Sequence, residues 1–161
     1  METDRQRTIA NQCHQRIQAR IREVGWVGLA ADEQHFENTL AFYGDVEGNG
    51  LDSVFFNSYL GDMAEELLES LRAIGADKAA AIFERSFAYF PDAKVPVGLD
   101  NRAEVLRQKR DRAGEIEFFN KLCEEFYAEA EKRSTTLYRF ILSHADDFEK
   151  LHGMVYREPT A

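Results

Sequence analysis

The chain has 161 residues, of which 44% are hydrophobic and 12% aromatic, and this composition excludes a disordered or low-complexity protein. The length favours a single domain over residues 1–161 that can bury a core. Two cysteines are too few for a disulfide framework. No signal-peptide core and no apolar run of about 18 residues is present, so the sequence predicts a cytoplasmic protein.

The net charge of −9 is distributed unevenly along the chain. Residues 26–92 contain thirteen Asp and Glu against three Lys and Arg, a balance of −10, whereas residues 1–25 have a balance of +2. A negative field repels nucleic acid phosphates and anionic lipids and attracts basic proteins. We therefore expect no direct nucleic acid binding and no membrane binding, and we expect a basic partner.

Apolar residues recur every three or four positions, the period of a helix face, through most of the sequence. The first predicted helix runs from Thr3 to Val24, and a second begins at Asp32. The glycine-rich stretch 44–52 is expected to be a turn. Asn-Gly often predicts a β-hairpin, but the flanking segments lack a period of two, so a short aromatic helix is expected after the turn.

Asp62 is predicted to be the N-cap of the next helix, and Gly75 to end it and join it to a second helix in an αα-hairpin. Further helices follow, the last starting at Ser134, and residues 152–161 are expected to fray. The prediction is an all-α, single-domain bundle of hairpins with about seven or eight helices. Within it, one group of residues is expected to shape the glycine turn and the hairpin: Asn49, Gly50, Phe55, Phe56, Asn57 and Gly75.

Asn57 stands between aromatic residues, and we expect its amide to hold the glycine turn through hydrogen bonds to the backbone.

The sequence matches no catalytic or cofactor-binding template. It has no glycine-rich phosphate loop, no nucleophile elbow and no HExxH motif. His144, Asp146 and Asp147 would not all face the same side of one helix. We therefore expect no catalytic residue, no metal site and no cofactor, and hence a protein that is not an enzyme.

One pattern in the sequence does indicate a function, and it is a row of acidic residues. Asp62, Glu65, Glu66 and Glu69 recur at three and four positions, opposite the apolar stripe of the same predicted helix, and no lysine interrupts them. Three acids of the preceding turn can extend the row: Asp45, Glu47 and Asp52. Two interpretations remain open. The row is either a solvated helix face or a substitute for a line of DNA phosphates.

Around these residues the sequence resembles a bacterial family of unknown function that includes a DNA-mimic protein. The resemblance covers roughly residues 30–130. It rests on Glu47, Gly50, Phe55 to Ser58, Leu71 to Ala76, Lys78 to Ala81, Phe90-Pro91 and Glu124 to Tyr127. The chain departs from the family pattern at Asn49-Gly50, where the family has Gly-Gly, and at Leu51, where it has an aromatic residue.

The resemblance implies an all-helical domain that can form a homodimer. It also implies that the carboxylates occupy the DNA-binding surface of a basic DNA-binding protein, either a transcription regulator or a nucleoid protein. The alternative is a generic helical interaction domain, such as an immunity-type protein, that binds a partner through the aromatic residues near the glycine turn.

Overall fold

The computed structural model describes residues 4–157, which contain helices and turns and no strand. The all-α prediction is therefore confirmed. The α-helices are α1 (Asp4–Val24), α2 (Ala31–Asn49), α3 (Ser53–Phe56), α4 (Ala64–Ala73), α5 (Asp77–Ser86), α6 (Leu99–Lys109), α7 (Arg112–Glu129), α8 (Arg133–Ser143) and α9 (Ala145–His152). Short 3-10 helices are η1 (Trp26–Gly28), η2 (Tyr59–Met63), η3 (Phe87–Tyr89) and η4 (Pro91–Ala93).

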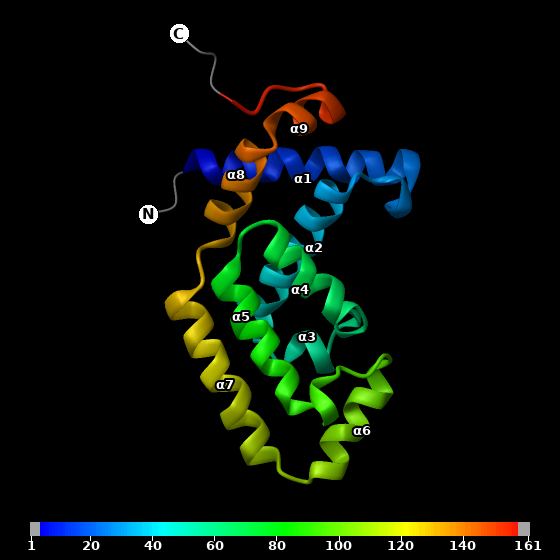
Figure 1. Ribbon diagram of the computed structural model, residues 1–161, viewed down its shortest axis with the longest axis vertical. Helices are drawn as coiled ribbons and strands as arrows, with labels where there is room; N and C mark the ends of the chain where they lie inside the picture. The colour runs from blue at the N-terminus through cyan, green and yellow to red at the C-terminus, as the bar shows by residue number, and fades with distance from the viewer. Residues whose placement is uncertain (1–3, 158–161) are drawn as a thin grey trace.

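The molecule is elongated, and α1 lies across one end of it beside α8 and α9 (Figure 1). Helix α2 leaves that end and packs along α4, α4 pairs with α5, and α5 packs along α7. Helices α6 and α7 reach the opposite end. No helix in residues 4–157 is long and apolar enough to span a membrane.

Phe55 lies at the centre of the aromatic core. This fully buried ring of α3 stacks on Phe83 of α5 with 5.6 Å between centroids. It also contacts Phe90 at 5.2 Å and Phe119 of α7 at 5.8 Å. Ring pairs at these separations add roughly 0.5–1.5 kcal/mol each beyond the burial of their area. The four-residue helix α3 therefore joins α5 to α7 through one side chain.

The hairpin of α4 and α5 forms as predicted, and Gly75 ends the first helix. Gly75 has φ of 77°, a conformation that favours glycine. Its N–H donates to the Arg72 carbonyl at 3.1 Å, and the Ala76 N–H donates to the Leu71 carbonyl at 2.8 Å. These two bonds satisfy carbonyls that the helix end would otherwise leave unpaired.

The predicted turn at residues 44–52 is too long. Helix α2 continues through Gly44 and Gly48 to Asn49, and the chain turns only at Gly50, where φ is 94°. The buried residues Phe42, Tyr43 and Val46 hold this part of α2 in the core, and their burial outweighs the helix-weakening effect of glycine.

The last predicted helix is divided at His144 into α8 and α9, and the prediction of a frayed tail is wrong for residues 152–157. His152 is buried, and Tyr156 is only 2% exposed. The Tyr156 hydroxyl lies 2.6 Å from Nδ1 of His152. Nε2 of His152 reaches the buried Glu33 carboxylate at 2.9 Å. The remaining residues of that predicted tail, 158–161, lie outside the described residues.

Candidate acidic binding surface

The outer face of α4 carries three carboxylates. Leu67, Leu68 and Leu71 of α4 are buried against the core, so the helix presents Glu65, Glu66 and Glu69 to solvent. These glutamates line a shallow, open depression together with Arg72. Within residues 4–157 none of the three forms an ion pair, because Arg72 binds Glu84 of α5 at 2.7 Å instead. We call Glu65, Glu66 and Glu69 the α4 acidic face.

The axial spacing of the charges on this face is close to that along one strand of DNA. At 1.5 Å per residue, Glu65 to Glu69 spans about 6 Å of helix axis, so the mean rise between successive charges is about 3 Å. Each strand of duplex DNA carries about one charge per 3.4 Å of its axis. The buried leucines fix the helix, so the three carboxylates are held together despite mutual repulsion of a few tenths of a kcal/mol per pair, roughly.

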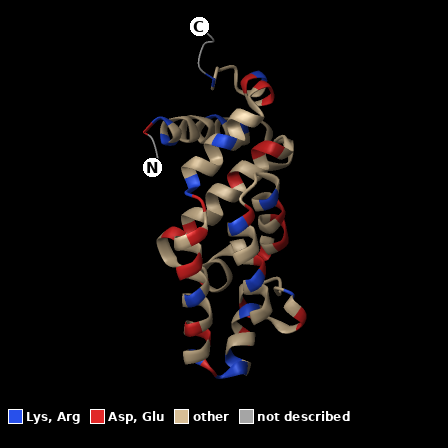
Figure 2. Ribbon diagram, turned by 60° about the vertical axis from the view of Figure 1, so that its left-hand side comes forward, with Lys and Arg blue, Asp and Glu red and all other residues tan. Residues whose placement is uncertain are grey.

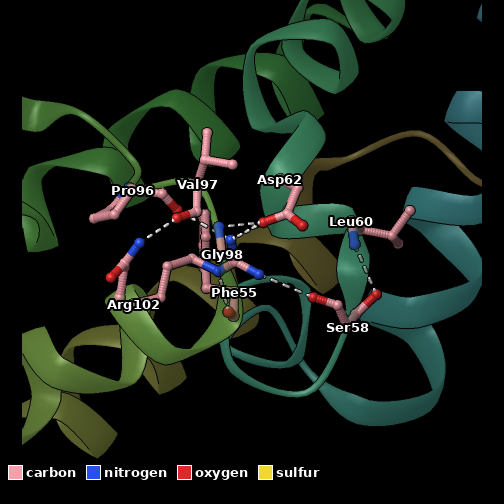
Figure 3. A network of polar contacts seen from close by, with 9 residues as sticks. Phe55, Ser58, Leu60, Asp62, Pro96, Val97, Gly98 and Arg102 are labelled. Atoms are coloured by element: carbon pink, nitrogen blue, oxygen red, sulfur yellow. Dashed lines mark hydrogen bonds and ion pairs between the residues drawn. The ribbon is translucent and has the colours of Figure 1, made fainter.

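Asp62 is not the N-cap of α4, contrary to the sequence prediction. The N-cap is Met63, and Asp62 belongs to η2. Its carboxylate turns away from the row and accepts hydrogen bonds from Arg102 of α6 and from the Gly98 N–H at 2.7 Å (Figure 3). The Arg102 bond, followed by the Gly98 bond, lowers the pKa of Asp62. The side chain is still 41% exposed, but its charge is matched by an internal cation.

Arg102 is a fully buried cation that the sequence analysis missed. Its guanidinium donates to the carbonyls of Phe55 at 2.6 Å, Pro96 at 3.0 Å and Ser58 at 3.3 Å, besides Asp62 (Figure 3). It thereby ties α6 to α3 and η2. A Cβ added at Gly61 would lie 2.6 Å from Nε of Arg102, so the glycine makes this close approach possible. In the sequence, Arg102 stands in a strongly charged stretch with few apolar residues, and nothing there distinguishes it from the exposed arginines nearby.

The three remaining acids of the predicted row belong to α2 and to the turn that follows it, not to α4. Asp45 accepts from the Asn49 amide at 3.0 Å and from the Ser53 hydroxyl at 3.1 Å, so it braces the turn around Gly50. Oε2 of Glu47 lies 3.6 Å from Nη1 of Arg133 in α8. Asp52 is half-buried in the same turn.

The residues predicted to shape the turn have different roles. Phe55 is buried and Phe56 is half-buried within the aromatic core. The side chain of Asn57 is exposed and makes no hydrogen bond to the turn among the described residues, so the prediction for its amide is wrong. Other groups hold the turn: Asp45 accepts from the side chains of Asn49 and Ser53. The Leu51 N–H donates to Sγ of Cys123 at 3.0 Å.

Folding neutralises part of the charge excess counted along the sequence. Three arginines from outside residues 26–92 bind acids of that segment: Arg20 to Glu33, Arg102 to Asp62 and Arg133 to Glu47. Figure 2 shows Lys and Arg interspersed with Asp and Glu along the molecule. The α4 acidic face keeps its full charge, because no arginine reaches it from another element in residues 4–157.

The described residues hold no group of three or more His, Cys, Asp or Glu side chains placed to bind a metal ion. Both cysteines are free, and burial raises the pKa of the Cys13 and Cys123 thiols, which disfavours the reactive thiolate.

A family model described as DMP19-like protein matches residues 28–144, which is most of the chain. The chain belongs to the DMP19-like protein family. The match includes the α4 acidic face and the Arg102 network, and it confirms the resemblance to the family with a DNA mimic. The comparisons with curated proteins and with solved structures found no match.

The Glu124 to Tyr127 segment of this DMP19-like protein is largely structural. The Tyr127 hydroxyl donates to the Val46 carbonyl at 2.8 Å, in the last turn of α2. Phe126 is buried against Tyr43 with 5.3 Å between ring centroids, and Glu125 binds Arg85 of α5. The segment thus holds α7 against α2 and α5. Of its two acids, Glu124 is exposed and forms no ion pair with the described residues.

Proposed function

We propose that this DMP19-like protein is a non-enzymatic DNA mimic in the cytoplasm that occupies the DNA-binding surface of a basic protein, such as a transcription regulator or nucleoid protein. The observation that carries the proposal is the α4 acidic face, three exposed carboxylates without ion pairs in residues 4–157. Membership of the DMP19-like family supports the same assignment.

The physical basis is charge pairing with a preorganised surface. Lys and Arg side chains that bind phosphates in DNA would bind the glutamates instead, at a similar axial spacing. The helix is fixed by its buried leucines, so little conformational entropy is lost on binding. Such pairing is screened by salt, and we expect the affinity for the partner to fall as the salt concentration rises.

The alternative, an interaction domain that binds through the aromatic residues of the glycine turn, has little surface available. Phe55 is fully buried in the core and Phe56 is half-buried. Two aromatic residues near the turn are strongly exposed, Tyr59 and Tyr127, and the Tyr127 hydroxyl is bound to the Val46 carbonyl. This distribution favours the acidic face as the primary contact surface.

The test compares two triple variants with the same change in net charge. The first, E65Q/E66Q/E69Q, neutralises the α4 acidic face. The control, E117Q/E124Q/D147N, neutralises three exposed acids on α7 and α9 that have no ion pair in residues 4–157. Each immobilised chain is exposed to lysate of the source cells at low salt, and bound proteins are eluted with duplex DNA.

We expect the wild type and the control to retain a basic DNA-binding protein that duplex DNA releases, and the first variant to lose it. Equal retention by both triple variants would show that the α4 acidic face is not the binding surface. A partner that duplex DNA fails to release would contradict mimicry.

A further inference from the structure

A second feature of the surface is a pocket between α1, α2 and η2. It has a volume of about 320 Å³. Trp26, Tyr59 and Met63 contribute aromatic and apolar walls, and Gln18, Glu37 and Asn38 contribute polar groups. The volume is at the lower end for small-molecule sites, roughly 300–1,000 Å³. The pocket therefore suits a single side chain better than a cofactor.

The pocket contains a carboxylate that lacks a permanent cation. Glu37 is only 8% exposed, and its two oxygens accept from Nδ1 of His14 at 2.7 Å and from the Gln18 amide at 2.8 Å. No Lys or Arg pairs with it in residues 4–157, whereas Glu33, one turn earlier on α2, is bound by Arg20 at 2.7 Å. Burial raises the pKa of Glu37, as expected for a carboxylate with little charge compensation.

The aromatic walls are accessible. Trp26 is 38% exposed and Tyr59 is 72% exposed. Aromatic faces attract cations, and the planar guanidinium of arginine also stacks on them. Each oxygen of Glu37 has a second lone pair available beyond its bond to His14 or Gln18. The pocket thus combines aromatic surface with hydrogen-bond acceptors and negative charge.

We propose that this pocket receives the guanidinium group of an arginine from a protein partner, stacked on Tyr59 and hydrogen-bonded to Glu37. Arginine fits better than lysine because its flat, forked donor group can stack and bind a carboxylate together. Met63 of the pocket is the N-cap of α4, the helix that carries the α4 acidic face. That the arginine belongs to a DNA-binding protein rests on the proposed function.

The pocket contains its own reporter, because Trp26 is the only tryptophan in the chain. N-acetyl-arginine amide is titrated into the whole protein at constant ionic strength while tryptophan fluorescence is recorded. The lysine analogue keeps the charge without the planar group, and the citrulline analogue keeps the planar shape without the charge. We expect saturable binding of the arginine probe, affinity about tenfold lower for lysine, and no saturation with citrulline.

Two variants test whether the fluorescence change comes from arginine bound in this pocket. E37Q removes the negative charge, and Y59A removes an exposed aromatic wall with little risk to the fold, so it serves where E37Q is unstable. Each is expected to weaken binding of the arginine probe by about tenfold. The variant E65Q/E66Q/E69Q should bind the probe within about twofold of the wild type, since ions screen exposed charges that do not touch the probe.

The proposal is overturned if the arginine probe gives no saturable change, if citrulline binds equally well, or if Y59A leaves the affinity unchanged. A different set of results would show that the proposed DNA-mimic function is wrong while the pocket proposal holds. In that case E65Q/E66Q/E69Q would retain the basic partner as well as its control does, while arginine would still bind to the pocket.

Discussion

Arg102 is the residue whose role depends most on the tertiary structure. Sequence patterns place it among charged residues of a solvated helix, yet it is fully buried and donates to three backbone carbonyls and Asp62. Local periodicity could not reveal it, because its partners are 6 to 47 positions away in the sequence. The same contact explains why Asp62 leaves the acidic row.

Replacing Arg102 with methionine should destabilise the protein by about 3 kcal/mol, because methionine has a similar length but cannot donate to the three carbonyls or pair with the charge of Asp62. R107M is the matched control, since Arg107 lies on the same helix with its side chain 68% exposed. Chemical denaturation of both variants measures the change. A loss for R102M no larger than that for R107M would contradict a structural role.

His152 makes the stability depend on pH. Burial lowers its pKa below the ordinary value of 6.5, an effect that the hydrogen bond to Glu33 partly opposes. The unfolded chain therefore binds this proton more tightly than the folded chain. Stability should fall as the pH decreases from 6.5 toward the lowered pKa, with a slope of at most about 1.4 kcal/mol per pH unit.

The variant H152Q keeps a hydrogen-bond donor for Glu33 and removes the titration. Its unfolding free energy should decrease less than that of the wild type between neutral pH and about pH 5. In this range the unfolded wild-type chain binds a proton at His152 more tightly than the folded chain does. Burial raises the pKa of Glu37, which acts in the opposite direction, but Glu37 is present in both chains and cancels in the comparison. Parallel pH profiles would contradict the account.

At the scale of elements, the sequence predicts most helices and the hairpin at Gly75, because both signals are local. The period of apolar residues defines the helix faces, and a glycine after the last buried residue marks the end. The predictions failed where distant contacts decide the outcome. Helix α2 continues past two glycines because its last turns are buried, and the chain after His152 is held by Tyr156 and Glu33.

Two glycines test the assigned helix ends, because Gly75 ends α4 whereas Gly48 lies within α2. Gly75 has φ of 77°, so G75A should destabilise the protein by about 1 kcal/mol. Gly48 is exposed within α2, and an added Cβ would meet nothing within 4 Å, so G48A should stabilise it by about 0.5 kcal/mol. Thermal unfolding of both variants measures the shifts. Shifts of the same sign would be inconsistent with the assigned helix ends.

At the scale of the molecule, the charge balance along the sequence overstates the acidic surface. Arginines from α1, α6 and α8 return to the acidic segment and bind Glu33, Asp62 and Glu47. The sequence analysis could identify Glu65, Glu66 and Glu69 as one helix face, but the positions of these arginines depend on the fold. The α4 acidic face is the part of the predicted row that the structure keeps together. A homodimer, which the family resemblance implies, stays a prediction.

Competition with DNA tests the central claim most directly. A fluorescent duplex is bound to the purified basic partner at low salt, and its anisotropy is followed as the wild type, E65Q/E66Q/E69Q or E117Q/E124Q/D147N is added. We expect the wild type and the control to release the duplex completely, and E65Q/E66Q/E69Q to require at least about tenfold higher concentration, since three charge-assisted contacts are lost. If a ternary complex of partner, duplex and wild type forms instead, the protein does not mimic DNA.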